Sequence, residues 1–130
     1  MLSVDTNVLV RFLVRDHPAQ SAQAGELIHD NQIWIAKSVL LETEWVLRDT
    51  YAFSPGQVAS AFRDLSGLLQ VQIEDDTQVA QAIDWLQSGI DFADALHLAS
   101  SESAGQFATF DRKFAIRTAK LASVPVLLLR

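Results

Sequence analysis

Hydrophobic positions along the chain follow two different spacings. Short apolar runs rich in β-branched residues predict strands, at Leu2–Val4, Ile33–Ala36, Val71–Ile73, Phe107–Phe110 and Val124–Leu129. Longer stretches with apolar residues every three or four positions predict amphipathic helices. These helices are expected at Val8–Val14, from Pro18 to about His29, from Val39 to about Asp49, from Pro55 to near Gly67, from Asp75 or Asp76 to Gln87, at Asp91–Ser103 and from Asp111 to about Lys120.

Local signals predict where several of these elements begin and end. Ser38 and Ser54 are predicted helix N-caps, and Pro55 fits the first helical position after Ser54. Gly89 is expected to end the helix before it. The final run, Val124–Leu129, is almost entirely apolar and fits a buried parallel strand with Pro near its start.

Strands that alternate with helices predict right-handed crossovers and a parallel sheet covered on both faces, an α/β fold. Functional sites in such sheets lie beyond the carboxyl ends of the strands. A length of 130 residues fits one domain, residues 1–130.

Composition narrows the chemistry and the compartment. The chain has no cysteine, which excludes disulfides and thiolate metal sites and favours a reducing compartment. Its start lacks the basic and apolar regions of a signal peptide, and no apolar run approaches the roughly 20 residues that span a bilayer. These features predict a cytoplasmic protein that does not enter a membrane.

Acidic residues follow two of the predicted strands. Asp5 follows the first strand, and Asp111 follows the fourth, each at the start of a helix. An N-cap is the simplest role for either residue, and a cap can also serve as a metal ligand. Two acids at two strand ends of one sheet favour the functional role more strongly than one alone.

Two further acids are better ligand candidates than their neighbours. Glu42 shares a helix stripe with apolar residues, whereas Glu44 has Arg48 four residues later and is expected to form an ordinary surface pair. Asp94 lies one turn beyond Asp91, which is explained as a first-turn acid that complements the helix dipole. His97 shares that face, where a lone histidine is more often packed or hydrogen-bonded than a ligand.

Four carboxylates and no cysteine are the ligand set of Mg²⁺ or Mn²⁺ rather than of zinc. At ~4 Å, each carboxylate pair repels by about 1 kcal/mol in water and about 4 kcal/mol at an effective dielectric of 20. A divalent cation removes this repulsion and attracts a phosphate, which is the basis of metal-assisted phosphodiester hydrolysis.

The net charge of −6 is the wrong sign for a generally basic nucleic-acid surface. The residues after Asp111 include no acid but do include Arg112, Lys113, Arg117, Lys120 and Arg130. Two explanations stay open, a solvated helix face and a phosphate-contacting rim beside the acids.

Four motifs resemble the PIN-domain ribonucleases, and most closely the VapC-type toxins of bacterial toxin–antitoxin modules. The likeness runs from about residue 2 to residue 128 and rests on Val4-Asp5-Thr6-Asn7-Val8-Leu9, Leu41-Glu42-Thr43-Glu44-Trp45-Val46-Leu47, Asp91-Phe92-Ala93-Asp94-Ala95-Leu96-His97 and Thr109-Phe110-Asp111-Arg112-Lys113-Phe114. The resemblance implies an α/β/α sandwich around a mainly parallel sheet of about five strands. It also implies endonuclease activity on RNA that depends on Mg²⁺ or Mn²⁺ and leaves a 5′-phosphate and a 3′-hydroxyl.

The resemblance also implies roles for particular residues. The acidic quartet and metal ligands correspond to Asp5, Glu42, Asp94 and Asp111. Thr6 and Thr109 resemble the hydroxyl residues that orient those acids, and Asn7 is a polar neighbour. Arg112 and Lys113 are candidate RNA contacts.

The likeness further implies a homodimer and a small antitoxin that inserts an arginine among the acids. Candidate interface residues are Trp45, Leu47, Tyr51 and Phe53, for which core packing is the alternative. A non-catalytic PIN-like interaction domain that keeps the acids as helix caps is the alternative function. A phosphatase with an aspartyl nucleophile is disfavoured because Thr6 and Asn7, rather than a second acid, follow Asp5. The RNA target, the number of metal ions and the antitoxin are not revealed by the sequence.

Overall fold

The computed structural model describes residues 1–130, which fold as two compact units. The first unit comprises residues 1–76 and the second residues 77–130. Each unit contains parallel strands connected by helices, so each is described separately. The single domain expected from chain length stays a prediction.

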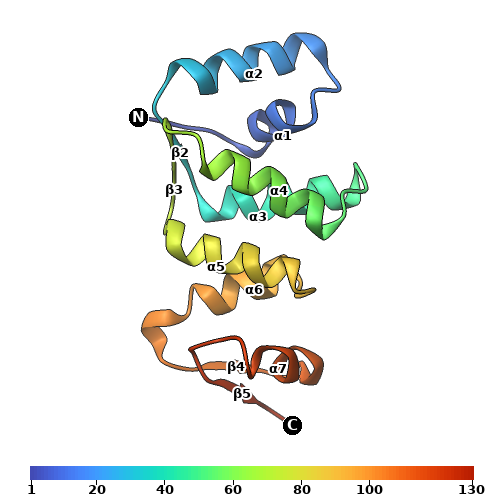
Figure 1. Ribbon diagram of the computed structural model, residues 1–130, viewed down its shortest axis with the longest axis vertical. Helices are drawn as coiled ribbons and strands as arrows, with labels where there is room; N and C mark the ends of the chain where they lie inside the picture. The colour runs from blue at the N-terminus through green and yellow to red at the C-terminus, as the bar shows by residue number, and fades with distance from the viewer. The chain divides into compact units, whose positions relative to one another are not determined.

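The first unit holds a three-stranded parallel sheet in the order β1-β2-β3. Figure 1 shows β2 and β3 side by side near the N-terminus. Leu2 pairs with Ile33, and Ile33 pairs with Val71, so the strands run in register along the sheet. The elements in chain order are β1 Leu2–Ser3, α1 Thr6–Val14, α2 Pro18–Asp30, β2 Ile33–Ile35, α3 Lys37–Asp49, α4 Pro55–Ser66 and β3 Val71–Ile73.

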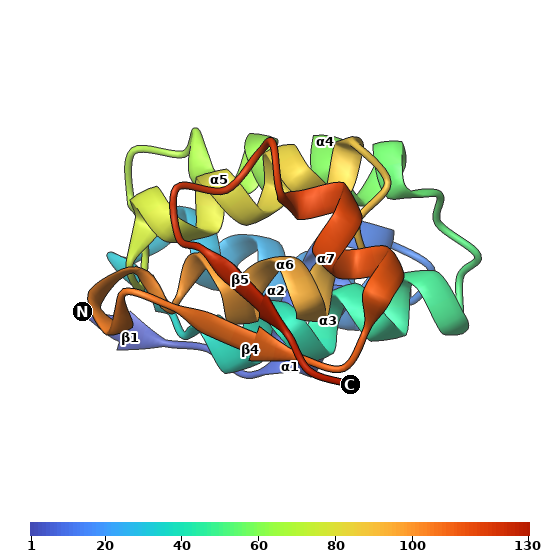
Figure 2. The ribbon, with the colours of Figure 1, turned by 90° about the horizontal axis from the view of Figure 1, so that it is seen from below.

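The second unit contains two strands that pair in parallel, with Phe107 opposite Val126 (Figure 2). Its elements are α5 Asp76–Gln87, α6 Phe92–Ala99, the 3-10 turn η1 Glu102–Ala104, β4 Phe107–Thr109, α7 Arg112–Thr118 and β5 Val126–Leu128. The rings of Phe107 and Phe114 meet edge to face with centroids 5.8 Å apart, which fixes α7 against β4.

Apolar side chains of both units are removed from solvent. In the first unit the fully buried residues include Leu9, Ile33, Ile35, Leu40 and Phe62, and in the second they include Ile83, Phe92 and Leu98. Each such side chain contributes about 1.5–3 kcal/mol through burial. None of the helices has the length and apolar character needed to cross a membrane.

The predicted α/β class and the parallel pairing are confirmed, and a helix or strand lies at each predicted place. The strands form one sheet of three and one of two, whereas about five in one sheet were expected. The prediction that the final strand is fully buried was also wrong. Leu127 is 45% exposed, because Val126 and Leu128 face the protein and Leu127 faces the opposite side.

Two helix boundaries differ from the prediction for identifiable reasons. The predicted cap Ser38 lies inside α3, whose N-cap is Ala36. Ala36 has no side-chain cap, and a carboxylate oxygen of Glu74, just after β3, accepts the backbone N–H of Lys37 at 2.9 Å instead. The helix expected to reach Ser103 ends at Ala99, and the chain continues in the 3-10 turn η1.

The four interface candidates divide into three kinds. Trp45 is 52% exposed, Tyr51 and Phe53 are half-buried, and Leu47 is completely buried. For Leu47 the alternative of core packing therefore holds, because its side chain is completely buried. The Tyr51 hydroxyl donates to Asp16 at 2.9 Å, which gives this side chain a structural role.

Candidate metal centre

Two of the predicted acids occupy the same local structure, one in each unit. Asp5 follows β1 and caps α1, where its Oδ1 accepts the backbone N–H of Val8 at 3.2 Å. Asp111 follows β4 and caps α7, where its Oδ1 accepts the N–H of Phe114 at 3.0 Å. Each cap uses one carboxylate oxygen, so Oδ2 can serve as a cation ligand. The predicted cap is therefore confirmed at both positions, and the role as metal ligand stays a prediction.

The first unit brings Asp5 and Glu42 to one pocket. The pocket has a volume of about 300 Å³, and its lining residues are Asp5, Thr6, Asn7, Ser38, Val39 and Glu42. Because β1 and β2 are parallel, the segments that follow them leave the sheet at the same edge. The start of α1 supplies Asp5 there, and α3 supplies Glu42. Five of the six lining residues carry an oxygen or amide group in the side chain, and none is Lys or Arg.

The solvent exposure of Glu42 and Glu44 is the reverse of what their neighbours in the sequence suggested. Glu42 is exposed on α3, whereas Glu44 is only 3% exposed. The predicted pair with Arg48 is confirmed at 2.9 Å between Arg48 Nε and Glu44 Oε2. It is not the ordinary surface pair that was expected, because its carboxylate is buried. Glu42 is therefore the glutamate that remains accessible to a cation.

The second unit brings Asp94 and Asp111 to another pocket, of about 180 Å³. Its lining residues are Gly89, Ile90, Asp91, Asp94, Asp111, Lys113, Phe114 and Arg117. Arg117 Nη1 donates to the Gly89 carbonyl at 2.8 Å, so one wall of the pocket is fixed by this contact. Gly89 has φ of +96°, a backbone conformation that other residues rarely adopt.

Asp94 has the clearest electrostatic signature among the candidate ligands. Burial raises its pKa above the ordinary value, and the nearby charges of Asp91 and Asp111 raise it further, while His97 lowers it. The Asp91 side chain caps α6 by accepting the N–H of Asp94 at 3.2 Å. Asp94 thus lies in the first turn, closer to the helix start than expected. His97 is exposed and does not line the pocket.

The hydroxyl residues lie beside the acids as the motif implied. Thr109 Oγ1 accepts the backbone N–H of Asp111 at 3.0 Å, which holds the start of the turn that presents Asp111. Thr6 is buried and lines the pocket of Asp5 together with Asn7. Sequence reasoning missed Ser38 as a lining residue, because its position suggested a helix cap.

The donor sets of both pockets suit a hard divalent cation. Carboxylate, hydroxyl and amide oxygens are the ligands of Mg²⁺ and Mn²⁺. Burial is the main cause of the raised pKa of Asp94, and a bound cation would relieve the further repulsion from Asp91 and Asp111. Neither unit by itself gathers three acidic or histidine side chains closely enough to hold an ion. The meeting of both acid pairs at a single centre stays a prediction.

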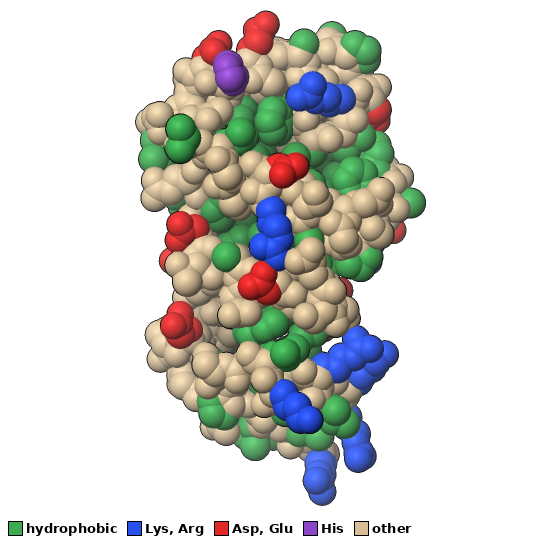
Figure 3. All heavy atoms as spheres, viewed as in Figure 1, with side chains coloured by type: hydrophobic (Ala, Val, Ile, Leu, Met, Phe, Trp, Pro, Cys, Tyr) green, Lys and Arg blue, Asp and Glu red, His purple; other side chains and the backbone are tan.

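Basic residues gather on the second unit around α7 and the chain end (Figure 3). Arg112, Lys113, Arg117 and Lys120 are all exposed there. Lys113 and Arg117 line the same pocket as Asp94 and Asp111, so these two cations lie beside the acids and not on a remote helix face.

Comparison with known proteins identifies the class that the strand–acid–helix repeats suggest. The PIN domain family matches residues 2–120, which is nearly the whole chain. The protein belongs to the PIN domain family. Proteins with this domain are commonly nucleases and typically use divalent metal ions. No curated protein matches the chain.

Proposed function

We propose that this protein is a Mg²⁺-dependent endoribonuclease and the VapC-type toxin of a toxin–antitoxin module that inhibits translation. The observation that carries the proposal is the repeated arrangement of acids. Each unit presents two of the four motif acids at one pocket, Asp5 with Glu42 and Asp94 with Asp111. Family membership adds the nuclease-type fold.

In this proposal Asp5, Glu42, Asp94 and Asp111 would together hold one or two Mg²⁺ ions, with Mn²⁺ as a possible substitute. The bound metal would polarise the phosphodiester and make an attacking water more acidic. Asp111 or Glu42 accepts the proton of that water, directly or through a second water. Arg112 and Lys113 contact phosphates on either side of the cut bond and so position the RNA. Cleavage then leaves a 5′-phosphate and a 3′-hydroxyl.

The test is cleavage of a mixed-sequence RNA pool in Mg²⁺, in Mn²⁺ and in EDTA. Asp5→Asn and Asp94→Asn remove one acid from each unit while keeping the size of the side chain. Asp64→Asn removes an exposed carboxylate of α4 that lies outside both pockets and serves as the matched control. We expect cleavage by the wild type and the control only, and only with metal. Undiminished cleavage in EDTA or by the two pocket variants would refute the proposal.

The proposed partners are RNA, an antitoxin and a second copy of the chain. Supporting a protein partner, Trp45 exposes half of its surface on α3, the helix that carries Glu42. An antitoxin arginine placed among the acids would neutralise their charge and inhibit cleavage. Light scattering of the purified chain, alone and with the product of a neighbouring small gene, tests both assemblies.

One observation favours a non-catalytic alternative. Asp5, Asp91 and Asp111 all cap helices, so a purely structural reason exists for three acids of the motifs. In that case the chain is a PIN-like interaction domain that does not respond to Mg²⁺. The absence of both cleavage and a metal-dependent change in melting temperature would favour this alternative.

A further inference from the structure

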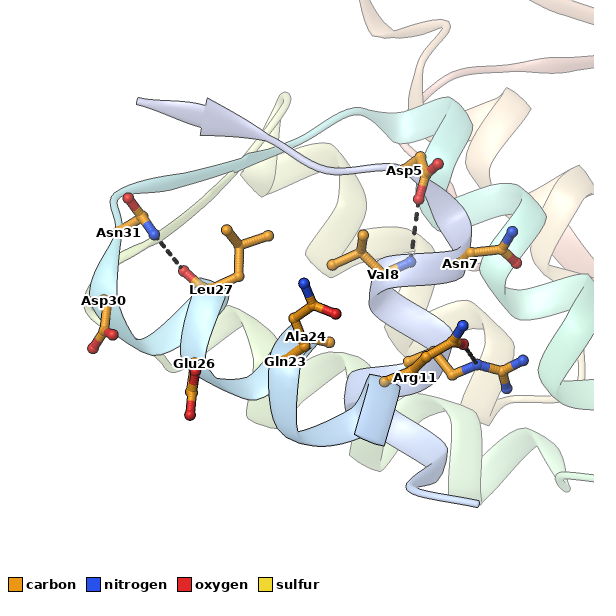
Figure 4. Close-up of a pocket in the computed structure, with 11 residues that line it drawn as sticks. Asp5, Asn7, Val8, Arg11, Gln23, Ala24, Glu26, Leu27, Asp30 and Asn31 are labelled. Carbon is orange, nitrogen blue, oxygen red and sulfur yellow. Dashed lines mark hydrogen bonds between the residues drawn. The ribbon is translucent and has the colours of Figure 1, made fainter. Parts of the chain in front are cut away.

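A pocket of the first unit lies between α1 and α2 (Figure 4). Its volume is about 640 Å³, within the range of roughly 300–1,000 Å³ that is typical of small-molecule sites. Asp5 and Asn7 line both this pocket and the pocket that contains Glu42. The two pockets therefore adjoin, and whatever occupies the larger one lies next to the candidate metal ligand Asp5.

The pocket combines apolar walls with polar groups at its margin. Val8 of α1 and Leu27 of α2 extend into the space between the helices, and the Gln23 amide rises from α2 beside them (Figure 4). Ala24 is buried and forms part of the floor. A flat ligand with apolar faces and hydrogen-bonding edges matches this division.

Hydrogen bonds within the protein hold two further amides in place. Asn31 Nδ2 donates to the Leu27 carbonyl at 2.8 Å, which leaves Oδ1 as the acceptor that this side chain can offer. Gln20 Oε1 accepts from Arg11 Nε at 2.7 Å, which leaves its NH₂ group as the donor. The margin thus offers a positioned acceptor and a positioned donor in addition to the Gln23 amide.

The charges at the pocket disfavour a phosphate. Arg11 is the only Lys or Arg in the lining, and its Nη1 also donates to Asp16 at 3.2 Å. The other charged lining residues are the acids Asp5, Glu26 and Asp30. An anionic group would be repelled, whereas a neutral ligand that donates hydrogen bonds from amino groups would be attracted.

We propose that this pocket binds one unpaired nucleobase of the RNA, next to the bond that is cut, and prefers bases with an exocyclic amine. The inference rests on the proposed nuclease activity. Val8 and Leu27 contact the faces of the base, and Gln20, Gln23 and Asn31 contact its edge. Single-stranded RNA is recognised in this way, by contacts to base faces and edges. Adenine, cytosine and guanine carry the amine, and uracil does not.

The experiment compares cleavage of a randomised single-stranded RNA pool in Mg²⁺, with the cut ends sequenced. Gln23→Leu removes the amide at nearly constant size, and Leu27→Trp fills the space. Ala22→Trp, at an exposed position of α2 outside the lining, is the matched control. We expect the wild type and the control to disfavour uracil at one position beside the cut. Each pocket variant should weaken that preference about tenfold, as expected for the loss of roughly 1.4 kcal/mol of base discrimination.

The outcomes separate this inference from the proposed function. If the wild type cleaves no RNA with either Mg²⁺ or Mn²⁺, both the nuclease and the inference fail. If it cleaves and the two variants keep the wild-type base profile, the inference alone is overturned. If Leu27→Trp does not fold, two other measurements decide the question. They are the base profile of Gln23→Leu and a titration of the Asp94→Asn variant with cytidine and with uridine. Equal binding of the two nucleosides would overturn base recognition. Displacement of bound RNA only by an Arg- and Leu-rich peptide would overturn base recognition in favour of a protein partner.

Discussion

The two units use the same local structure to present an aspartate but surround it differently. In both, an Asp two residues after a short parallel strand caps the following helix through Oδ1. The cap fixes the backbone of the turn through one carboxylate oxygen, and at Asp111 the Thr109 hydroxyl also accepts the backbone N–H of the aspartate. A helix start after a parallel strand is thus enough to place a candidate metal ligand.

The difference lies in the neighbours of these aspartates. In the first unit Asp5 shares its pocket with exposed Glu42 and with hydroxyl and amide groups. In the second unit Asp111 lies near Asp94, whose pKa is raised, and near Lys113 and Arg117. The second unit therefore combines neighbouring acids with cations that suit phosphate contact. In the first unit the pocket of Asp5 instead adjoins the amide-lined pocket between α1 and α2.

The largest expected effect tests whether the two acid pairs act as one centre. If they share their metal, Asp5→Asn or Asp94→Asn alone should abolish the stabilisation by Mg²⁺. For the wild type this stabilisation is about 2.7 kcal/mol at a Mg²⁺ concentration 100 times the Kd. Thermal unfolding with and without Mg²⁺ measures it, with Asp64→Asn as the control that should keep the full response. If each single variant instead kept about half of the response, the two pairs would bind metal independently.

The next effect separates the two glutamates of α3. Arg48→Met leaves the Glu44 carboxylate buried without this cation, which should cost about 1–3 kcal/mol of stability. Glu42→Gln removes an exposed charge and should leave stability within about 0.5 kcal/mol while it lowers cleavage strongly. Urea unfolding and RNA cleavage of both variants measure the contrast. A stable Arg48→Met variant, or an active Glu42→Gln variant, would contradict this division of roles.

Sequence reasoning succeeded wherever the signal was local. Asp5 and Asp111 follow apolar runs directly, and Ser54 with Pro55 starts α4 as predicted, through a capping box with Gln57. The α/β class followed from the same alternation of short and long apolar patterns.

Sequence reasoning failed where contacts between residues far apart in the chain decide the local structure. The first N–H of α3 is capped by Glu74, which lies 37 residues away in the chain, so no nearby residue signals that Ser38 is not the cap. The burial of Glu44 depends on how α3 packs, which the spacing between Glu44 and Arg48 does not reveal. The pocket between α1 and α2 likewise arises from packing, since no motif marks its lining.

A smaller effect distinguishes the capping role of the aspartates from their role as ligands. Asp5→Ala and Asp111→Ala remove the cap and should each cost about 1 kcal/mol, whereas the corresponding Asn variants keep a capping oxygen and should cost less. All four variants should lose cleavage to a similar extent, because Asn does not replace a carboxylate ligand. Unfolding and activity are measured on the same preparations. Cleavage that follows stability across the four variants would show that the acids act only as caps.

The smallest effect concerns Asp94 and pH. Its pKa in the folded protein is raised, mainly by burial and then by Asp91 and Asp111, so the folded state holds this proton more tightly than the unfolded state. The resulting contribution to stability is full below the ordinary value of 3.8 and is lost as the pH rises through the raised pKa. The Asp94→Asn variant has no carboxyl group at this position, so it does not lose this stability as the pH rises. In EDTA, the melting temperature of the variant relative to the wild type should therefore increase between about pH 4 and pH 7. Asp64→Asn, measured over the same range, gives the reference for removal of an exposed carboxylate. A relative melting temperature that stays flat or falls with pH would show that burial and the neighbouring acids do not oppose the ionisation of Asp94, and the strongest electrostatic reason for a cation in the second unit would be lost.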